Sequence, residues 1–242
     1  MVQKLTPKLI KQRMTGERVS LVGGAGFIGH NLALALRNVG AEVQIIDNLM
    51  QNNMLANVSD DDIDPFRREL NHSFLVQRFE KMRISGVTMD NADARSMIDL
   101  AEKLKEFQPT KVVHLAAISS AVDAKKSPGH CFDLQLVTLR NVLEYTRLFK
   151  NEINEVVFMS SSTVYGDFKT ETVEENVRPQ PYGIYANAKF MGERLIRTYH
   201  EQYGLGISII RPSALYGERC ISRRVSQAFI ENALMGKPLL LE

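Results

Sequence analysis

The sequence has few of the features that mark secreted, membrane-spanning or metal-binding proteins. Its 242 residues include only two cysteines, Cys131 and Cys220, which are far apart and have no metal-ligand spacing. We therefore expect reduced thiols, no metal site and a cytoplasmic location. No apolar run approaches the ~18 residues that a membrane helix needs, and the basic residues 1–17 lack the apolar stretch of a signal peptide. The 30 basic and 28 acidic residues leave a net charge of only +2, which gives no electrostatic reason to expect nucleic acid or an anionic membrane as a partner.

What the chain does contain is a regular alternation of short apolar runs and amphipathic helical segments. The runs are nearly continuous in apolar residues, as is typical of parallel strands that are buried on both faces. The pattern predicts an α/β protein with a doubly wound parallel sheet and helices on both faces. The expected strands are residues 18–22, 41–47, 86–93, 111–117, 155–162 and 206–212, and the expected helices are residues 30–40, 94–107, 129–150, 185–204 and 223–236.

Two segments do not fit the alternation. Residues 1–17 are polar, and we expect a short helix or a loose leader before a domain that covers residues 18–212. Residues 48–86 interrupt the pattern, and we interpret them as an insertion in which residues 65–83 could be helical. The sequence assigns no role to this insertion.

A glycine turn follows the first expected strand. Gly23, Gly26 and Gly29 form G-x-x-G-x-x-G between a strand and a helix. In a dinucleotide site one such glycine makes the tight turn, one admits the pyrophosphate to the backbone, and one lets the helix pack against the strand. The N–H groups at the start of the helix can then bind the phosphate. The spacing also occurs at ordinary turns, but its placement here favours a Rossmann-like dinucleotide-binding sheet.

Two acidic residues follow neighbouring strands. Asp47 ends the second expected strand, where an acid can bind the adenosine ribose hydroxyls, and because a carboxylate repels a 2′-phosphate and no arginine follows closely, NAD is favoured over NADP. The alternative is a solvated acid at the end of a strand. Asp93 could accept a hydrogen bond from the adenine amino group, and an equally good interpretation is the N-cap of the helix that begins at residue 94.

The segment 182–189, "YGIYANAK", contains a candidate acid–base pair. Tyr185 and Lys189 are four residues apart and share one face of a helix. An ammonium beside a phenol stabilises the phenolate, lowers the pKa of the tyrosine from ~10 and equips it to exchange protons with an alcohol. Tyr182 has the wrong spacing, and we expect it to pack or to line the pocket rim. By spacing alone, the pair could equally be surface decoration.

A serine-rich segment, "SSSTVYG" at residues 160–166, supports the catalytic interpretation. It follows the fifth expected strand, and ligands of open α/β sheets bind at the carboxyl ends of the strands. A serine there could bind the alcohol oxygen that Tyr185 deprotonates. The alternative is an ordinary loop that caps a helix.

Taken together, the motifs resemble one family. "GGAGFIG", "IIDN", "VVHLAA", "SSSTVYG", "YANAK" and "RPSALYG" occur in the order seen in the extended short-chain dehydrogenase/reductases, most narrowly in their NAD-dependent epimerase/dehydratase group, from about residue 18 onward. The resemblance implies that the catalytic residues are Ser161, Tyr185 and Lys189. It implies further cofactor contacts at Phe27, Ile28, Asn48, Ala94, Leu115, Ala116 and Ala117, and sugar contacts at Ser119, Ser161, Ser162, Thr163 and Tyr185.

The resemblance also narrows the reaction. Dehydratases of this group carry an Asp-Glu pair where this chain has Ser162 and Thr163, so the resemblance implies an NAD-dependent 4-epimerase of a nucleotide sugar, most simply a UDP-sugar. A one-way nucleotide-sugar dehydrogenase or reductase with the same residues, and a non-catalytic NAD-binding protein, are the alternatives. The chain departs from the family pattern at Gln135, Ala214 and Glu218, which stand for two asparagines and a proline.

The resemblance carries two expectations about organisation. Residues 213–242 would begin a smaller substrate-binding region that is mostly absent from this chain. Members of the family are often dimers through two long helices, here around residues 130–149 and 185–203, so we expect a homodimer.

Overall fold

The computed structural model describes residues 6–50, 63–118, 120–222 and 225–239. They form a six-stranded sheet in the order β3-β2-β1-β4-β5-β6, and every neighbouring pair is parallel. The strands are β1 (Arg18–Val22), β2 (Glu42–Ile46), β3 (Thr88–Asp90), β4 (Lys111–His114), β5 (Glu155–Met159) and β6 (Ile207–Ile210). The predicted doubly wound parallel sheet is confirmed.

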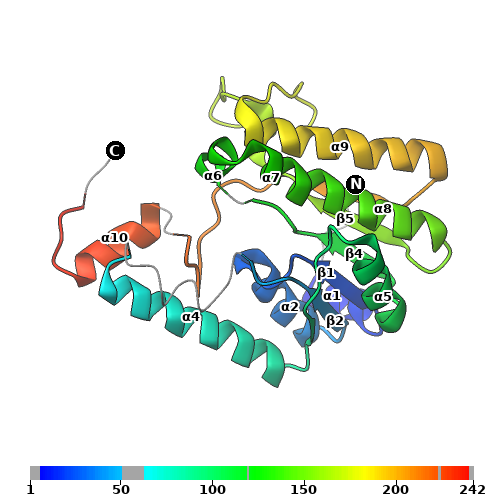
Figure 1. The fold of residues 1–242 in the computed structure, drawn as a ribbon, viewed down its shortest axis with the longest axis horizontal. Helices are drawn as coiled ribbons and strands as arrows, with labels where there is room; N and C mark the ends of the chain where they lie inside the picture. The colour runs from blue at the N-terminus through cyan, green and yellow to red at the C-terminus, as the bar shows by residue number, and fades with distance from the viewer. Residues whose placement is uncertain (1–5, 51–62, 119, 223–224, 240–242) are drawn as a thin grey trace.

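Helices cover both faces of the sheet, as predicted. Alternate residues of the strands point to opposite faces, so Val22 and Ile46 join the core beneath α5 (Met97–Phe107), α8 (Thr138–Leu148) and α9 (Gly183–Tyr203). Leu21 and Ile45 join the core beneath α2 (Phe27–Asn38) and α4 (Pro65–Ile84). Figure 1 shows α8 and α9 on one side of the strands and α2 and α4 on the other. The remaining helices are α1 (Pro7–Met14), α6 (Ala121–Lys126), α7 (Pro128–Phe132) and α10 (Val225–Leu234).

Helix boundaries follow local chemistry. The Asp64 carboxylate caps α4 by accepting from the Phe66 N–H, and Pro65 occupies the first helical position, where its missing N–H costs nothing. Helix α9 ends at Gly204, which adopts the left-handed conformation that glycine permits most readily. Helix α5 ends one residue before Gln108, also left-handed, and Pro109 follows.

Several elements differ from the sequence-based expectation. The strand expected at 111–117 ends at His114, and "LAA" leaves the sheet to line a cavity. The helix expected at 129–150 is divided into α7, a π-helical turn (Asp133–Val137) and α8. Residues 65–84 of the expected insertion form α4, the crossover between β2 and β3, and residues 7–14 of the leader form α1. Residues 1–5, 51–62, 223–224 and 240–242 lie outside the described residues.

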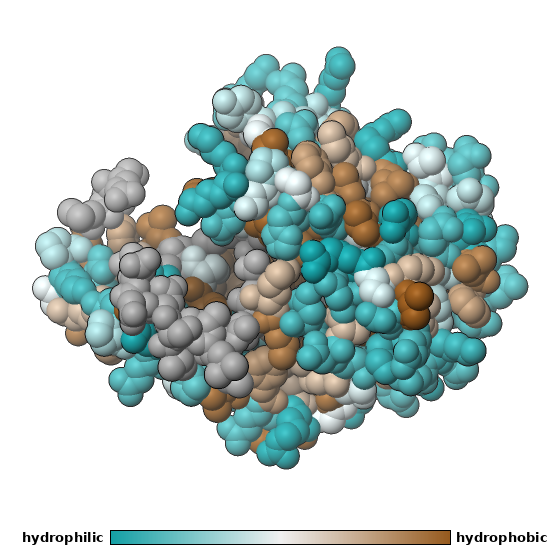
Figure 2. All heavy atoms as spheres, viewed as in Figure 1, coloured by the Kyte–Doolittle hydropathy of each residue, from teal (hydrophilic) through white to brown (hydrophobic). Residues whose placement is uncertain are grey.

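The surface is ordinary for a chain with 24% charged residues. Figure 2 shows that hydrophilic side chains cover most of the face seen in that view. Within the described residues, no helix combines the length and the apolar composition that crossing a bilayer requires.

Candidate functional site

A cavity of about 720 Å³ lies at the carboxyl ends of the central strands, the edge at which open α/β sheets bind ligands. It brings together every predicted site residue except Ser119, which lies outside the described residues. These residues are Gly23, Gly26, Phe27, Ile28, Gly29, Asp47, Asn48, Asp93, Ala94, Leu115, Ala116, Ala117, Ser161, Ser162, Thr163, Tyr185 and Lys189.

The glycine turn forms one end of the cavity. Gly23 has a φ of +78°, and a Cβ there would lie 2.5 Å from the backbone of Ala116. A Cβ on Gly29 would lie 2.1 Å from the carbonyl oxygen of Gly24. Gly26 is the N-cap of α2 and brings no side chain to the start of the helix. Gly23 and Gly29 therefore tolerate only glycine, and the first residues of α2 line the cavity, where their N–H groups favour an anion. Gly24, which the spacing argument omitted, is equally tight, with a Cβ position 2.7 Å from Leu21.

Asp47 follows β2 beside this turn. Its Oδ2 atom accepts from the Ala25 N–H at 2.9 Å, and its Oδ1 atom accepts from the Leu49 N–H at 2.8 Å. Burial raises the pKa of the carboxyl group, and these two backbone hydrogen bonds oppose that shift. The carboxylate is therefore held at the cavity wall by the glycine loop, and the interpretation as a merely solvated acid is wrong.

Asp93 lines the same cavity as Asp47 and follows the end of β3 by three residues. Its carboxylate pairs with Arg95, whose Nη2 atom is 2.5 Å away, and accepts from Asn48 Nδ2 at 3.3 Å. The hydrogen bonds from Arg95 lower the pKa of Asp93. Asp93 is not the N-cap of α5, because that position is Ser96, whose hydroxyl accepts from the Asp99 N–H. The helical alternative is thus wrong, since the local pair with Arg95 competes successfully for the carboxylate.

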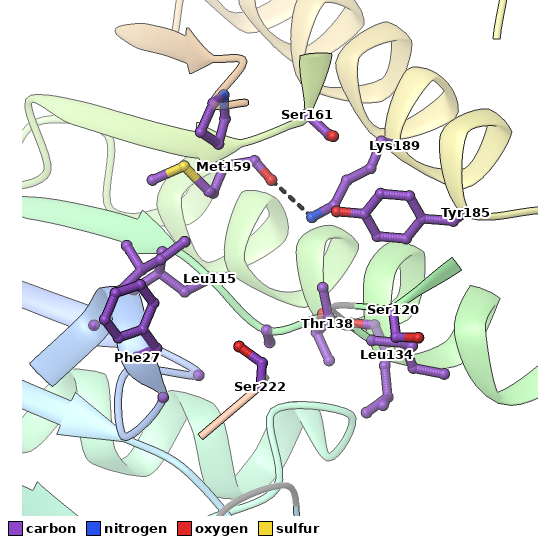
Figure 3. A pocket seen from close by; sticks show the side chains of 18 of the residues that line it. Phe27, Leu115, Ser120, Leu134, Thr138, Met159, Ser161, Tyr185, Lys189 and Ser222 are labelled. Carbon is purple, nitrogen blue, oxygen red and sulfur yellow. Dashed lines mark hydrogen bonds between the residues drawn. The ribbon is translucent and has the colours of Figure 1, made fainter. Parts of the chain in front are cut away.

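The candidate acid–base pair lies at the other end of the cavity. Tyr185 and Lys189 project from the first turns of α9, and Lys189 Nζ is 5.9 Å from the centre of the Tyr185 ring. Lys189 is buried, its Nζ donates to the carbonyl oxygen of Met159 at 2.7 Å, and burial lowers its pKa to about 8. Figure 3 shows the Tyr185 phenol, the Lys189 ammonium and the Ser161 hydroxyl gathered in one region, with Phe27 and Leu115 across the cavity.

The serines after β5 have different surroundings. Ser161 lines the cavity, and its Oγ atom accepts from the N–H and the hydroxyl of Thr163 at 3.2 Å and 3.0 Å. Ser160 also lines the cavity, but its buried hydroxyl already donates to Glu193 Oε1 at 2.6 Å. Of the two neighbouring candidates, the geometry leaves Ser161 as the one that can donate to a ligand.

Tyr182 does not behave as expected. It is the N-cap residue of α9, it is 92% exposed, and it does not line the cavity. The expectation that it packs or lines the pocket rim is wrong, because the chain enters α9 with this side chain turned outward. The spacing argument that separated it from Tyr185 nevertheless agrees with the structure.

Sequence reasoning missed two buried polar groups at the site. His114 is buried at the end of β4; its Nε2 atom lies 2.8 Å from the hydroxyl of Thr138, and burial lowers its pKa to about 3. Thr138 donates to Leu134 O and lines the cavity. "VVHLAA" placed His114 next to the site, but nothing in the sequence showed that Thr138, 24 residues later, would meet it.

A second missed group joins α2 to the loop that precedes α10. Arg219 donates to His30 Nε2 at 3.0 Å and to Asn31 Oδ1 at 2.9 Å, and Arg78 donates from α4 to the Arg219 carbonyl oxygen. Arg78 is buried and lines the cavity. The partners in these hydrogen bonds are 141 and 189 residues apart in the sequence, and hydrophobic periodicity cannot predict contacts at that separation.

The three residues that depart from the family pattern have different surroundings in the structure. Gln135 is buried on the π-helical turn and donates from Nε2 to Cys131 Sγ at 3.2 Å. Ala214 lines the cavity, and Glu218 is an exposed partner of Arg219 at 2.6 Å. Among the described residues, no three His, Cys, Asp or Glu side chains gather as metal ligands would.

Comparison with known proteins relates the chain to one family. Residues 19–241 match the model of the NAD dependent epimerase/dehydratase family. UDP-glucuronate 4-epimerase 1 of Arabidopsis thaliana is 30% identical over 230 residues, which cover 95% of this chain and 49% of the relative. A putative UDP-glucose 4-epimerase of Methanocaldococcus jannaschii is 31% identical over 83% of this chain and 57% of its own length. The chain thus spans about half the length of these curated relatives.

Solved structures show the same relationship. The UDP-glucuronic acid 4-epimerase of Bacillus cereus, crystallised with UDP-glucuronic acid and NAD, superposes with a TM-score of 0.74 and 25% identity over 92% of this chain and 64% of that one. The UDP-glucose 4-epimerase of Thermus thermophilus, crystallised with NAD, superposes with a TM-score of 0.69 and 27% identity. The match covers 91% of this chain and 64% of that one. With the family model covering nearly the whole sequence, this chain belongs to the NAD-dependent epimerase/dehydratase family.

Proposed function

We propose that this chain carries the cofactor-binding and catalytic part of an NAD-dependent nucleotide-sugar 4-epimerase. The observation that carries the proposal is that one cavity holds the glycine turn at one end and Ser161, Tyr185 and Lys189 at the other. The relatives and the solved structures described above are named as 4-epimerases of UDP-sugars, which supports a UDP-sugar as the substrate.

The residues fit NAD. The lack of a Cβ at Gly23 and Gly29 lets the turn pack against the backbone of Ala116 and Gly24, and the tight turn directs the start of α2 toward the cavity, where a pyrophosphate would bind. The Asp47 carboxylate, held at the end of β2 by the Ala25 N–H, would bind the adenosine ribose hydroxyls and repel a 2′-phosphate. Asn48, Asp93 and Ala94 would flank the adenine, while Leu115, Ala116 and Ala117 would line the middle of the cofactor. When bound, NAD supplies the acceptor and then the donor of a hydride at the sugar C4 atom.

Tyr185 and Ser161 handle the sugar 4-hydroxyl. Tyr185, as a phenolate, accepts the proton of that hydroxyl while the Ser161 hydroxyl binds the same oxygen, so that C4 can lose a hydride and become a ketone. After the 4-keto sugar has turned its other face, Tyr185 returns the proton to the oxygen as C4 regains the hydride. Positioned acid–base groups of this kind typically contribute 10²–10⁴-fold. Ser162, Thr163 and Ser119 are proposed sugar contacts.

Lys189 keeps the tyrosine reactive. Its ammonium is buried beside the ring and fixed on the Met159 carbonyl, so it stabilises the phenolate without competing solvent. It would also donate to the ribose of the nicotinamide.

The organisation of the whole protein is part of the proposal. Residues 18–212 would form the cofactor and catalytic domain, and residues 213–242 would begin the substrate-binding region, which is consistent with Ser213, Leu215 and Ser222 lining the cavity. A homodimer through residues 130–149 and 185–203 is supported by exposed Leu148, Met191 and Tyr203 on those helices. A reducing, cytoplasmic setting is supported by two buried free thiols.

The test uses the purified full-length protein. Bound NAD is measured after denaturation, and UDP-, GDP- and dTDP-sugars are then incubated with the protein while sugar products and NADH absorbance are followed. A 4-epimer without net NADH supports the proposal and identifies the sugar. Stoichiometric NADH would instead show a one-way dehydrogenase, and bound NAD with no turnover on any sugar would show a non-catalytic binder.

A further inference from the structure

Helix α9 presents three residues of chemical interest at intervals of four. Tyr185, Lys189 and Glu193 therefore lie along one face of the helix. Helix α9 packs on β5 and on the 3-10 turn Ser162–Tyr165 that follows it. The first two residues belong to the proposed acid–base pair, whereas the third reaches neither the cavity nor a ligand, because Glu193 is buried and does not line the cavity.

Two of the three residues bond directly to the end of β5. Lys189 Nζ donates to the Met159 carbonyl oxygen at 2.7 Å, and the Ser160 hydroxyl donates to Glu193 Oε1 at 2.6 Å. The next residue, Ser161, lines the cavity in the same region as Tyr185 (Figure 3). Two consecutive residues at the strand end thus bond to two successive turns of the helix.

Glu193 is itself fixed by a third element. Arg211, which follows β6, donates from Nε to Glu193 Oε1 at 2.8 Å and from Nη2 to Oε2 at 2.7 Å. This two-pronged geometry restricts the carboxylate in both distance and angle. Arg211 is held in turn by the Glu175 carbonyl oxygen at 3.2 Å and by the Tyr165 ring, 4.7 Å from its guanidinium carbon.

The backbone connects the same elements on both sides of this contact. The Ser160 N–H donates to the Ile210 carbonyl oxygen at 2.8 Å, and the Ser162 N–H donates to the Pro212 carbonyl oxygen at 2.9 Å. Arg211 lies between those two acceptors. A shift of Glu193 would therefore move the segment that carries Ser161 relative to the helix that carries Tyr185 and Lys189.

We propose that Glu193, with Ser160 and Arg211, is a positioning group that sets the register of α9 on β5 and so brings Ser161, Tyr185 and Lys189 to one point. The inference rests on the proposed function for its kinetic consequence but not for its geometry. A displacement of about 1 Å in a catalytic constellation can cost on the order of 10²-fold in rate, so this contact should affect turnover more than binding.

The decisive variant is Ser160→Ala. It deletes one hydroxyl and leaves the Glu193–Arg211 ion pair in place, so the chain should still fold. The matched control is Ser208→Ala, which deletes a serine hydroxyl that donates to Glu155 Oε1 at 2.5 Å on the same pair of strands, at the opposite end from the cavity. We expect Ser160→Ala to lower kcat about tenfold or more, with KM and bound NAD within about twofold, and Ser208→Ala to keep the wild-type kcat.

A second comparison uses Glu193 directly. Glu193→Gln keeps an oxygen that can accept from Ser160, whereas Glu193→Ala removes it. We expect the glutamine variant to recover most of the kcat that the alanine variant loses. If Ser160→Ala only lowers the melting temperature, as Ser208→Ala does, and leaves kcat and KM unchanged, the positioning role is refuted and the contact is structural.

A readout independent of turnover separates this inference from the proposed function. The absorbance of tyrosinate is followed as pH rises in wild type, Ser160→Ala and Ser208→Ala. The part of this signal that is missing in Tyr185→Phe is assigned to Tyr185. Displacement of Lys189 from the ring should move that titration to higher pH in Ser160→Ala alone. An unchanged midpoint overturns the inference, whereas a shifted midpoint in a protein that turns over no sugar supports it and refutes the proposed function instead.

Discussion

The Nζ atom of Lys189 donates a 2.7 Å hydrogen bond to the carbonyl oxygen of Met159, the last residue of β5. This contact fixes an ammonium at the carboxyl end of the central sheet, 5.9 Å from the centre of the Tyr185 ring. It links the helix that supplies the acid–base pair to the strand end that supplies Ser161. The proposed chemistry therefore depends on the Lys189 ammonium, which is buried away from water.

The first prediction concerns the pH dependence of turnover. Burial lowers the pKa of Lys189 from 10.5 to about 8, so the ammonium should be lost as pH rises through about 8. Because the phenolate of Tyr185 depends on that charge, kcat should fall above this pH. The measurement is a profile of kcat from pH 6 to 10. In Lys189→Arg the guanidinium stays charged throughout, so a decline at the same pH in a folded Lys189→Arg protein would contradict the assignment.

The second prediction separates the two tyrosines of "YGIYANAK". Tyr185→Phe should reduce turnover by roughly 10²–10⁴-fold, because it removes the proposed proton acceptor, while NAD stays bound. Tyr182→Phe serves as the matched control, since Tyr182 is 92% exposed and lies outside the cavity, and it should keep most of the activity. Equal losses in the two variants, measured as kcat with a UDP-sugar, would rule out Tyr185 as the acid–base.

The third prediction tests the glycine turn. Gly23 and Gly16 have similar φ values of +78° and +83°, but a Cβ on Gly23 meets the Ala116 backbone at 2.5 Å, whereas a Cβ on Gly16 meets nothing within 4 Å. Gly16→Ala should therefore lower the free energy of unfolding by about 1–2 kcal/mol, the cost of the left-handed backbone conformation for alanine. Gly23→Ala should cost more and should also weaken NAD binding.

Thermal unfolding and calorimetric titration with NAD measure the two effects for this glycine pair. Ala116 must move to admit the new methyl group in Gly23→Ala, and it lines the middle of the cavity, so stability and affinity should fall together. Equal losses of stability in Gly23→Ala and Gly16→Ala, with wild-type NAD affinity in both, would show that the turn does not contact the cofactor.

How much of this molecule the sequence could predict depends on the range of the interaction. The strands were predictable because a buried parallel strand is a continuous apolar run, and β1 coincides with residues 18–22. The cavity lining was predictable because motifs at strand ends must meet at one edge. Glu193 gave no such signal, since its partners Ser160 and Arg211 are 33 and 18 residues away and each is an unremarkable residue in its own segment.

Local competition explains the other differences. Asp93 was a plausible N-cap by position, but Arg95, two residues later, takes its carboxylate and Ser96 caps the helix instead. This pair could have been found from the sequence, because an aspartate and an arginine two residues apart can bond within a turn. The π-helical turn at Asp133–Val137 could not have been predicted, because its residues continue the apolar pattern of an ordinary α-helix.

The last prediction concerns acid stability. His30 on α2 accepts a hydrogen bond from Arg219 and contacts the Gly26 carbonyl oxygen, and burial lowers its pKa to about 4. In the unfolded chain the pKa is 6.5, so between about pH 6.5 and 4 the unfolded state binds more protons and the free energy of unfolding decreases as pH falls. His30→Gln removes this contribution to the pH dependence, so its free energy of unfolding should fall by about 2 kcal/mol less than that of wild type between pH 7 and 4.5. His72→Gln, on the exposed side of α4, is the control and should follow wild type. Denaturant unfolding at each pH gives the comparison, and parallel curves for wild type and His30→Gln would show that His30 is not held neutral by the fold.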